Sequence, residues 1–359
     1  DISLLELYLP LLSGGEVVIA SRDEVKDGRH LGHMLEEFDI TVMQATPATW
    51  QMLIEGGWNG KESLRVFSGG EPLSRGLATQ LLERAGQVWN LYGPTETTVW
   101  STVEKVEAGD ETISVGRPIA NTSIYILDDN EKPVPAGFVG NLYIGGAGLA
   151  RGYHEKPDLT MDRFGTITLP NGEKERVYNT GDLARWTQDG KLECLGRSDF
   201  QIKLRGVRME LDDIEAHLVD SSRVKQAVVI RRDDLPGGPN LVAYVIPNGE
   251  TDGLIPDLRA HLSDRLPESM RPAFYSIVDE YPLTPNKKVD RKRLPVPQID
   301  RSGLETEYVA PQTESEQLLA DIFTEAFETE KFGIRDNFFE MGGDSLLAVR
   351  VLAQASEAF

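Results

Sequence analysis

Short apolar runs alternate with stretches of helical periodicity in the N-terminal part of the chain. The runs are Ile40–Met43, Leu64–Phe67 and a third that ends near Val88. The helical stretches are centred on Leu31 to Phe38 and on Leu77 to Ala85. Strands that alternate with helices are typical of an α/β layer with a mostly parallel sheet, so we predict that architecture here. Upstream, an apolar helix, a glycine turn and a buried strand at Val17–Ala20 are also predicted.

The polar loop Asn90–Glu96 follows the third run. In an α/β sheet, ligands bind at the carboxyl ends of strands, so this loop is predicted to border a crevice. Tyr92 offers a ring face for a purine, and Gly93 allows close approach of the backbone. Thr95 offers a hydroxyl to a phosphate oxygen, and Glu96 is a hard oxygen ligand for Mg²⁺. A Gly-Pro turn with a polar flank accounts for the same residues, so the loop alone leaves both interpretations open.

The middle of the chain, residues 121–195, contains short β patterns separated by turn dipeptides, which predicts a compact, barrel-like β subdomain. Asp182 lies in this subdomain, within a Thr-Gly-Asp sequence, and Gly-Asp by itself is typical of a plain turn. The charged, alternating run Gly196–Gly206 predicts a new sheet after a break. Beyond it we expect a small α/β domain with helices near 211–218 and 256–266.

The C-terminal part predicts a linker followed by helices. Proline and polar residues mark the linker at 296–311. Thr313 and Glu316 form a capping-box pattern that opens an amphipathic helix. Ser345 follows Gly342–Asp344 at the start of a second predicted helix, where it is either a helix cap or an exposed hydroxyl open to modification.

The composition of the chain disfavours several kinds of partner and site. Lys and Arg number 37 against 58 Asp and Glu, a net charge of -21, which disfavours nucleic acid and anionic membranes as main partners. One cysteine, Cys194, excludes an internal disulfide and fits a reducing, cytoplasmic compartment. The five histidines are scattered, and we predict no zinc site. No apolar stretch is long enough to span a membrane. The start at Asp1, inside an apolar helix, indicates a fragment.

Two segments resemble phosphate-binding loops, but neither has the complete motif. Gly60-Lys61 has Glu55 and Glu62 where a Walker sequence needs Gly and Ser or Thr. The segment Gly146–Arg151 has Arg where a dinucleotide fingerprint needs its third Gly. The longer stretch Gly140–Tyr153 alternates around Leu142 and Ile144, so we predict a structural role for it as a barrel strand leading into a turn.

Taken together, these motifs resemble the adenylation domain of nonribosomal peptide synthetases followed by a peptidyl carrier domain. The resemblance rests on Asn90–Glu96, the Thr180–Asp182 triplet, the run from Gly196 to Gly206, the lysine before Val289-Asp290-Arg291, and the Phe-Phe-x-x-Gly-Gly-x-Ser sequence that ends at Ser345. It implies a core at 1–196, a mobile subdomain at 197–295, the linker at 296–311, and a truncated four-helix carrier at 312–359.

The resemblance also implies roles for individual residues. ATP would be bound around adenine, ribose and phosphates, Asp182 would accept the ribose hydroxyls, and a hinge would lie near Arg197. Lys288 would contact the substrate carboxylate and phosphate, although Lys287 stands where the family usually has Gly. Ser345 would carry 4'-phosphopantetheine. The predicted ATP-binding residues are Gly69, Gly70, Glu71, Asn90, Tyr92, Gly93, Thr95, Asp182, Arg197, Lys203 and Lys288, with Glu96 on Mg²⁺ and Lys288, Thr95 and Glu96 as catalytic residues.

The amino acid pocket implied by the resemblance is formed by Asp1, Ile2, Leu5, Gln44, Phe67, Gly69, Leu91, Val99, Trp100 and Lys288. Asp1 and Lys288 would clamp the two charges of an α-amino acid, because an unpaired buried Asp1 would be costly. Phe67 and Trp100 leave little room between them, and the set resembles that of glycine-activating domains.

Two other functions remain open. A free-standing acyl- or aryl-CoA ligase of the same superfamily fits the ATP motifs, but Asp1 and the attached carrier oppose it. A noncatalytic carrier and binding scaffold is favoured by the absence of a Ser/Thr/Gly-rich phosphate loop upstream of Asp1. For the synthetase, the expected partners are a phosphopantetheinyl transferase and neighbouring condensation, epimerization or thioesterase domains. Asp344 replaces the more usual His, and family members with this Asp often precede an epimerization domain. Such a domain is an awkward partner for achiral glycine, so the downstream domain stays open.

Overall fold

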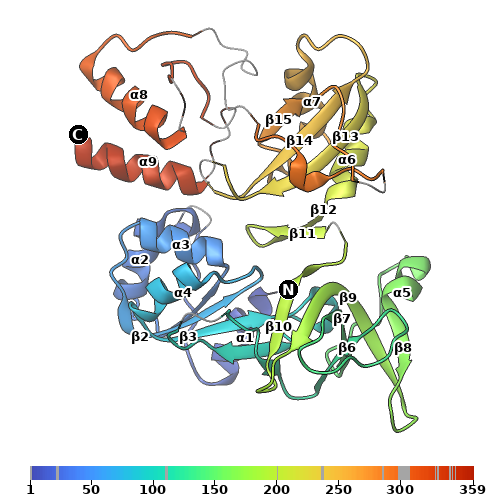
Figure 1. The fold of residues 1–359 in the computed structure, drawn as a ribbon. Coiled ribbons are helices and arrows are strands. Elements are labelled where there is room, and N and C mark those ends of the chain that lie inside the picture. The colour runs from blue at the N-terminus through green and yellow to red at the C-terminus, as the bar shows by residue number, and fades with distance from the viewer. Residues whose placement is uncertain are drawn as a thin grey trace. The chain divides into compact units, whose positions relative to one another are not determined.

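The computed structural model describes residues 2–21, 24–109, 112–199, 201–235, 238–284, 287–297, 308–327, 329, 331–338, 341, 343 and 345–359. The chain divides into two compact units, Asp1–Asp199 and Phe200–Phe359, and each is described by itself (Figure 1).

The first unit begins with an α/β layer. Its five-stranded sheet has the order β1 (Val42–Ala45), β2 (Lys61–Gly69), β3 (Ala85–Tyr92), β4 (Thr102–Lys105) and β5 (Arg117–Pro118). The first three strands are parallel, and β4 and β5 are antiparallel. The prediction of a parallel layer is therefore confirmed for β1 to β3. The helices are α1 (Ser3–Leu12), η1 (Glu24–Lys26), α2 (Gly28–Glu37), α3 (Pro47–Glu55) and α4 (Arg75–Leu82), and α2 to α4 gather on one side of the sheet (Figure 1).

Local chemistry explains where three of these helices begin. Asp27 caps α2 by accepting from the backbone N–H groups of Arg29 and His30. Thr46 caps α3, with Pro47 in its first turn, and Ser74 caps α4. Such caps satisfy N–H groups that have no partner within the helix. The apolar sides of these elements then form a buried core that includes Leu35, Trp50, Leu53, Leu64, Val66, Leu81 and Val88.

The predicted strand at Val17–Ala20 is wrong. These residues form no strand, and Ile19 is 78% exposed. The run is β-branched and apolar, but no neighbouring strand among the described residues pairs with it, and a strand needs such a ladder.

An antiparallel β subdomain completes the first unit, as predicted. Its sheet has the order β10 (Leu192–Arg197), β9 (Lys174–Trp186), β7 (Gly140–Gly146) and β6 (Thr122–Leu127), and β8 (Phe164–Thr168) also pairs with β9. Helix α5 (Pro157–Arg163) precedes β8. Ile126, Leu142, Ala184 and Leu192 form one of its buried clusters.

The second unit starts with a new sheet, which confirms the predicted break. Strand β10 ends at Arg197, and β11 (Gln201–Leu204) pairs with β12 (Val207–Glu210) in a separate hairpin. A three-stranded sheet of β13 (Val224–Arg232), β14 (Asn240–Pro247) and β15 (Phe274–Ile277) follows, with α6 (Leu211–Val219) and α7 (Leu254–Ser263) sharing its core. The short helices η3 (Glu268–Met270) and η4 (Arg291–Arg293) lie further along.

Helices α8 (Glu314–Phe327) and α9 (Ser345–Ala358) end the chain. The predicted capping box is present, because the Thr313 hydroxyl accepts from the Glu316 N–H at 3.2 Å and the Glu316 carboxylate accepts from the Thr313 N–H at 3.0 Å. Stacked and edge-on contacts join Phe323 and Phe327 of α8 to Phe332 and Phe338 in the segment between the helices. Leu347 and Val351 of α9 are buried in the same cluster. Most of the predicted linker, residues 298–307, lies outside the described residues.

No helix in the described part of the chain combines the length and the apolar character needed to cross a membrane.

Candidate active site

Strand register places four of the predicted pocket residues on one face of the parallel sheet. Gln44 of β1 pairs with Phe67 of β2, and Gly69 of β2 pairs with Leu91 of β3. Side chains alternate along a strand, so Phe67 and Gly69 share a face, and their partners in the neighbouring parallel strands share it too. Ile2 reaches the same region, since its Cδ1 lies 3.8 Å from the position of a Cβ on Gly70.

Trp100 covers the glycine at the centre of this face. A Cβ built on Gly69 would lie only 2.3 Å from the Trp100 Cη2 and 2.7 Å from its Cζ3. These distances are far below an ordinary carbon contact of about 3.5–4.0 Å. The ring is 4% exposed. Trp100 therefore occupies the space above Gly69 where a larger side chain would otherwise lie.

A strained turn at Thr98 and Val99 places Trp100 over Gly69. Thr98 and Val99 both have positive φ, +64° and +69°. The Trp100 N–H donates to the Thr98 carbonyl at 3.0 Å, which closes a γ-turn around Val99. Gly93 makes room for this turn, because a Cβ there would meet the Val99 carbonyl oxygen at 2.4 Å. A β-branched residue with positive φ is an outlier that persists only where its surroundings hold it.

A chain of hydrogen bonds orients the Trp100 indole. Its Nε1 donates to the Gln44 Oε1 at 2.7 Å. The Gln44 Nε2 in turn donates to the Glu6 Oε1 at 2.8 Å, and has a longer contact of 3.4 Å to the Ile2 carbonyl. Sequence reasoning missed Glu6. The signal was present, because Glu6 is the one charged residue in the otherwise apolar sequence of α1.

The predicted phosphate and metal residues lie in the short helix η2 (Thr95–Thr97), just beyond β3. Thr95 is exposed and Glu96 is 8% exposed. The Tyr153 hydroxyl donates to the Glu96 Oε1 at 2.5 Å. The glycine-rich segment also supports η2, since the Ala150 N–H donates to the Glu96 carbonyl at 2.8 Å. Burial and the bond to Glu96 raise the pKa of Tyr153, so its phenol remains a donor. Ala150 therefore holds the backbone of Glu96, and Tyr153 holds its carboxylate.

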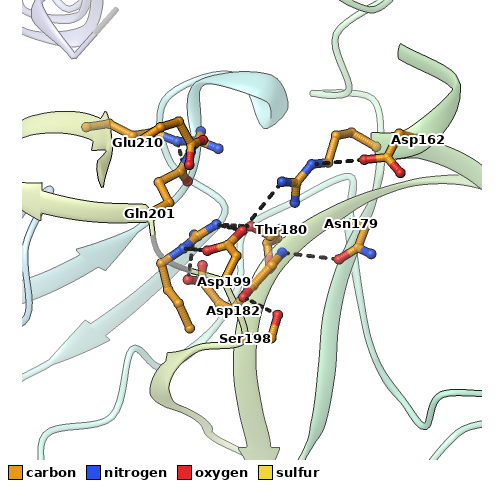
Figure 2. A network of polar contacts seen from close by, with 12 residues as sticks. Asp162, Asn179, Thr180, Asp182, Ser198, Asp199, Gln201 and Glu210 are labelled. Atoms are coloured by element: carbon orange, nitrogen blue, oxygen red, sulfur yellow. Dashed lines mark hydrogen bonds and ion pairs between the residues drawn. The ribbon is translucent and has the colours of Figure 1, made fainter. Parts of the chain in front are cut away.

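A polar network surrounds Asp182 (Figure 2). Its Oδ2 accepts from the Tyr92 hydroxyl at 2.5 Å, and its Oδ1 accepts from the Arg197 Nη1 at 2.8 Å. Arg197 also donates two hydrogen bonds to the Asp199 carboxylate, of 2.6 and 2.8 Å, and one to the Thr180 carbonyl at 3.0 Å. Burial and the Asp182 carboxylate raise the pKa of Tyr92 well above its usual value, which keeps the phenol protonated. Three predicted nucleotide residues, Tyr92, Asp182 and Arg197, are thus in direct contact.

Asn90 differs from its predicted setting. It lies in β3, as does Tyr92, so the loop begins only at Gly93. The Asn90 side chain is 4% exposed, and its Nδ2 donates to the Ser114 carbonyl at 2.9 Å. Its amide therefore ties β3 to a neighbouring segment.

The second unit holds Lys203, Lys288 and Ser345. Lys203 lies in β11, opposite Arg208 of β12. Lys288 is exposed at the end of a tight turn, which is closed by bonds from the Lys287 N–H to the Thr284 carbonyl, 2.9 Å, and from the Thr284 N–H to the Lys288 carbonyl, 2.8 Å. Lys287 takes a φ of +60°, the left-handed conformation that favours Gly.

Ser345 is the first residue of α9, a 14-residue helix. Gly343, two residues earlier, packs on Phe338, whose ring carbons would lie 2.4–2.6 Å from a Cβ on Gly343 and whose carbonyl accepts from the Gly343 N–H at 2.9 Å. Among the predicted site residues, Asp1 lies outside the described residues. No group of three or more His, Cys, Asp or Glu in the described part of the chain could hold a metal ion.

Three domain families match the chain. Residues 1–154 match the AMP-binding enzymes, residues 213–288 match the AMP-binding enzyme C-terminal domain, and residues 317–359 match the phosphopantetheine attachment site. The chain thus matches both domains of the AMP-binding enzymes and a carrier domain. Its curated relatives include a dimodular nonribosomal peptide synthase of Bacillus subtilis (strain 168), 46% identical over 99% of this chain, and tyrocidine synthase 1 of Brevibacillus parabrevis, 38% identical over 99%. The chain spans 15% and 32% of the length of these two proteins.

Solved structures agree with this assignment. The chain is similar over its full length to a holo four-domain nonribosomal peptide synthetase bound to AMP and glycine, with 42% identity, a TM-score of 0.55 and 27% of that chain covered. A holo synthetase protein with adenylation and carrier domains gives a TM-score of 0.76 at 24% identity, with 99% of this chain and 59% of that chain covered, and shows the shared fold.

These matches confirm several predictions for this chain. The adenylation and carrier domains, the mixed α/β fold and the class of ATP-dependent adenylating ligases agree with the families found. ATP as the nucleotide and 4'-phosphopantetheine as the carrier group agree as well. Mg²⁺ and the roles of individual site residues stay predictions.

Proposed function

We propose that this chain activates glycine with ATP, forming glycyl-AMP and pyrophosphate, and then passes the glycyl group to a phosphopantetheine thiol on Ser345. The observation that carries the choice of glycine is the Trp100 indole packed on Gly69. Both residues belong to the predicted amino acid pocket, so the large ring would fill space that a substrate side chain needs. The relative solved with AMP and glycine, 42% identical to this chain, supports the same choice.

The residues of the first unit would hold the reactants. Tyr92 lies beside Asp182, whose two carboxylate oxygens each keep accepting capacity for a ribose hydroxyl beyond the bonds from Tyr92 and Arg197. Thr95 would donate to phosphate, and Asp1 would bind the substrate ammonium. Glu96 suits Mg²⁺, because it contributes a hard carboxylate oriented by Tyr153 while ATP contributes further oxygens. When bound, the ion would offset phosphate charge.

In the first step, a carboxylate oxygen of glycine forms a bond to the α-phosphorus while the bond from that phosphorus to the pyrophosphate oxygen breaks. Two anions meet and a third leaves, so the barrier is largely electrostatic. Lys288 would supply positive charge to both the carboxylate and the phosphate. In the second step, the thiolate attacks the acyl carbon, a thioester forms, and AMP leaves after the second unit has withdrawn Lys288.

We further propose that the reaction takes place in the cytoplasm, that a phosphopantetheinyl transferase modifies Ser345, and that neighbouring synthetase domains consume the glycyl thioester. The lone Cys194 is compatible with a reducing compartment.

ATP–pyrophosphate exchange by the full-length protein tests the activation step, with glycine, alanine, serine and phenylalanine offered separately. We expect the fastest exchange with glycine. Faster exchange with alanine or a larger amino acid would overturn the choice of glycine, and the absence of exchange with every amino acid would overturn the activity itself.

A further inference from the structure

We infer that Glu6 is a positioning residue for amino acid selection, and that its carboxylate holds the Trp100 indole against Gly69 through the Gln44 amide. This inference rests on the proposed function, because it concerns the size of the amino acid that the first unit accepts. All four residues belong to that unit. Two hydrogen bonds connect them, 2.8 Å from Gln44 to Glu6 and 2.7 Å from Trp100 to Gln44.

The chemistry of Trp100 and Glu6 fixes the direction of the two hydrogen bonds that Gln44 makes between them. An indole N–H can only donate, and an ionised carboxylate can only accept. A Gln side chain between them must therefore turn its carbonyl to Trp100 and its NH₂ to Glu6. The opposite amide orientation would leave the indole N–H facing an NH₂ group and the Glu6 carboxylate facing a carbonyl oxygen.

Glu6 supplies the energy that keeps this orientation. A hydrogen bond to a charged acceptor is roughly twice as strong as one between neutral groups. The other acceptor for the Gln44 amide is the Ile2 carbonyl at 3.4 Å, beyond the usual range of about 2.7–3.2 Å. Without Glu6, the Gln44 NH₂ group keeps only this long contact, so the orientation of the amide, and with it the acceptor of the indole N–H, is held less strongly.

The position of the indole decides the depth available above Gly69. The ring lies so close that a methyl group on Gly69 would overlap it. Since Trp100 and Gly69 both belong to the predicted amino acid pocket, a shift of the ring by about 1 Å would change the space left in that pocket by about a methyl group, the difference between glycine and alanine as substrates. Glu6 thus acts on substrate size from outside the predicted pocket.

A plain structural role for Glu6 predicts something different. If the carboxylate only stabilised α1 or the surface around it, removing it would lower stability and slow the reactions with glycine and alanine alike. The ratio of the two reactions separates these roles, because a uniform loss of active protein cancels from it.

The experiment uses the full-length protein and four variants: Glu6→Ala, Glu6→Gln, Gln44→Leu and the double variant Glu6→Ala/Gln44→Leu. Glu37→Ala, which removes an exposed glutamate at the end of α2, is the matched control. ATP–pyrophosphate exchange gives kcat/KM for alanine and for glycine, and calorimetry reports the stability of each variant.

We expect Glu6→Ala to raise the alanine-to-glycine ratio about tenfold, the effect of losing one charge-assisted hydrogen bond. Glu6→Gln keeps a carbonyl acceptor and should stay within about threefold of the parent. Glu37→Ala should leave the ratio unchanged. In the Gln44→Leu background, Glu6→Ala should add nothing, because the connection is already broken.

A Glu6→Ala ratio within about twofold of the parent overturns the inference, and so does a Glu6→Ala effect that persists in the Gln44→Leu background. The inference is judged by the change in ratio relative to the parent, whichever amino acid the parent prefers. The proposed choice of glycine is judged by the parent ratio itself, so the two can fail separately.

Discussion

Adding a methyl group to Gly69 tests the central contact of the candidate site. In Gly69→Ala, the new Cβ would meet two Trp100 ring carbons at 2.3 and 2.7 Å and the Leu91 carbonyl oxygen at 2.9 Å. The ring must therefore move by about 1 Å to reach ordinary contact distance. It cannot do so freely, because it is 4% exposed, hydrogen-bonded to Gln44 and attached to a strained turn.

Overpacking of this kind costs about 1–3 kcal/mol. For a unit of this size, 1 kcal/mol lowers the unfolding temperature by roughly 2–4 °C, so we expect a decrease of about 4–8 °C for a cost near 2 kcal/mol. Calorimetry of the full-length protein measures it. The matched control is Gly76→Ala in α4, where a Cβ meets no atom within 4 Å. That change should be neutral or stabilise by about 0.5–1 kcal/mol, because Ala is the better helix former.

A double-mutant cycle identifies the cause. In a Trp100→Ala background, the two shortest contacts are gone while the Leu91 oxygen still opposes the methyl group, so Gly69→Ala should cost less than about half as much as in the parent. An unfolding temperature for Gly69→Ala within about 1 °C of the parent would refute the placement of the indole on Gly69. An equal cost with and without Trp100 would show that another contact is responsible.

Three shorter predictions concern other parts of the site. Asp182→Asn should raise the apparent KM for ATP at least tenfold in pyrophosphate exchange, because an amide offers one acceptor oxygen where the carboxylate offers two; an unchanged KM contradicts the ribose role. Lys288→Ala should reduce kcat at least a hundredfold while Lys287→Ala leaves it within about threefold, and the reverse pattern would reassign the catalytic lysine. Lys287→Gly should stabilise the second unit by about 1 kcal/mol in calorimetry, since it relieves a φ of +60°; a loss of stability counts against that strain.

Local patterns in the sequence predicted several of the helices and strands. Short apolar runs between helical stretches located β1 to β3, and the predicted capping box of Thr313 and Glu316 is present. The pairing of Gln44 with Phe67 follows once two strands are known to be parallel and in register. The run at Val17–Ala20 failed because its apolar residues predict a strand only if a partner strand exists, and that depends on the fold around it.

Features that depend on tertiary contacts were not predicted. Nothing in the residues Thr98 and Val99 favours positive φ, and Val is among the residues least suited to it. The bond from Tyr153 to Glu96 joins residues 57 positions apart, and the bond from Trp100 to Gln44 joins residues 56 apart. No spacing rule covers such distances, and only the folded chain brings these groups together.

The turn that carries Trp100 stores strain, and the burial of Trp100 offsets it. Two non-glycine residues with positive φ cost roughly 1–2 kcal/mol each. Burial of a Trp side chain removes about 150–250 Å² from water, worth roughly 4–6 kcal/mol at about 25 cal/mol per Å². The gain from burial therefore exceeds the cost of the strain while the indole is present.

With Ser in place of Trp100, most of that gain is lost and the strain is no longer offset, so Thr98 and Val99 should relax toward negative φ. The accepted amino acids would then broaden both because the ring is missing and because the backbone that lined the pocket has moved. A crystal structure of Trp100→Ser in which Val99 keeps its positive φ would show that Gly93 and the surrounding loop, not the indole, hold the turn.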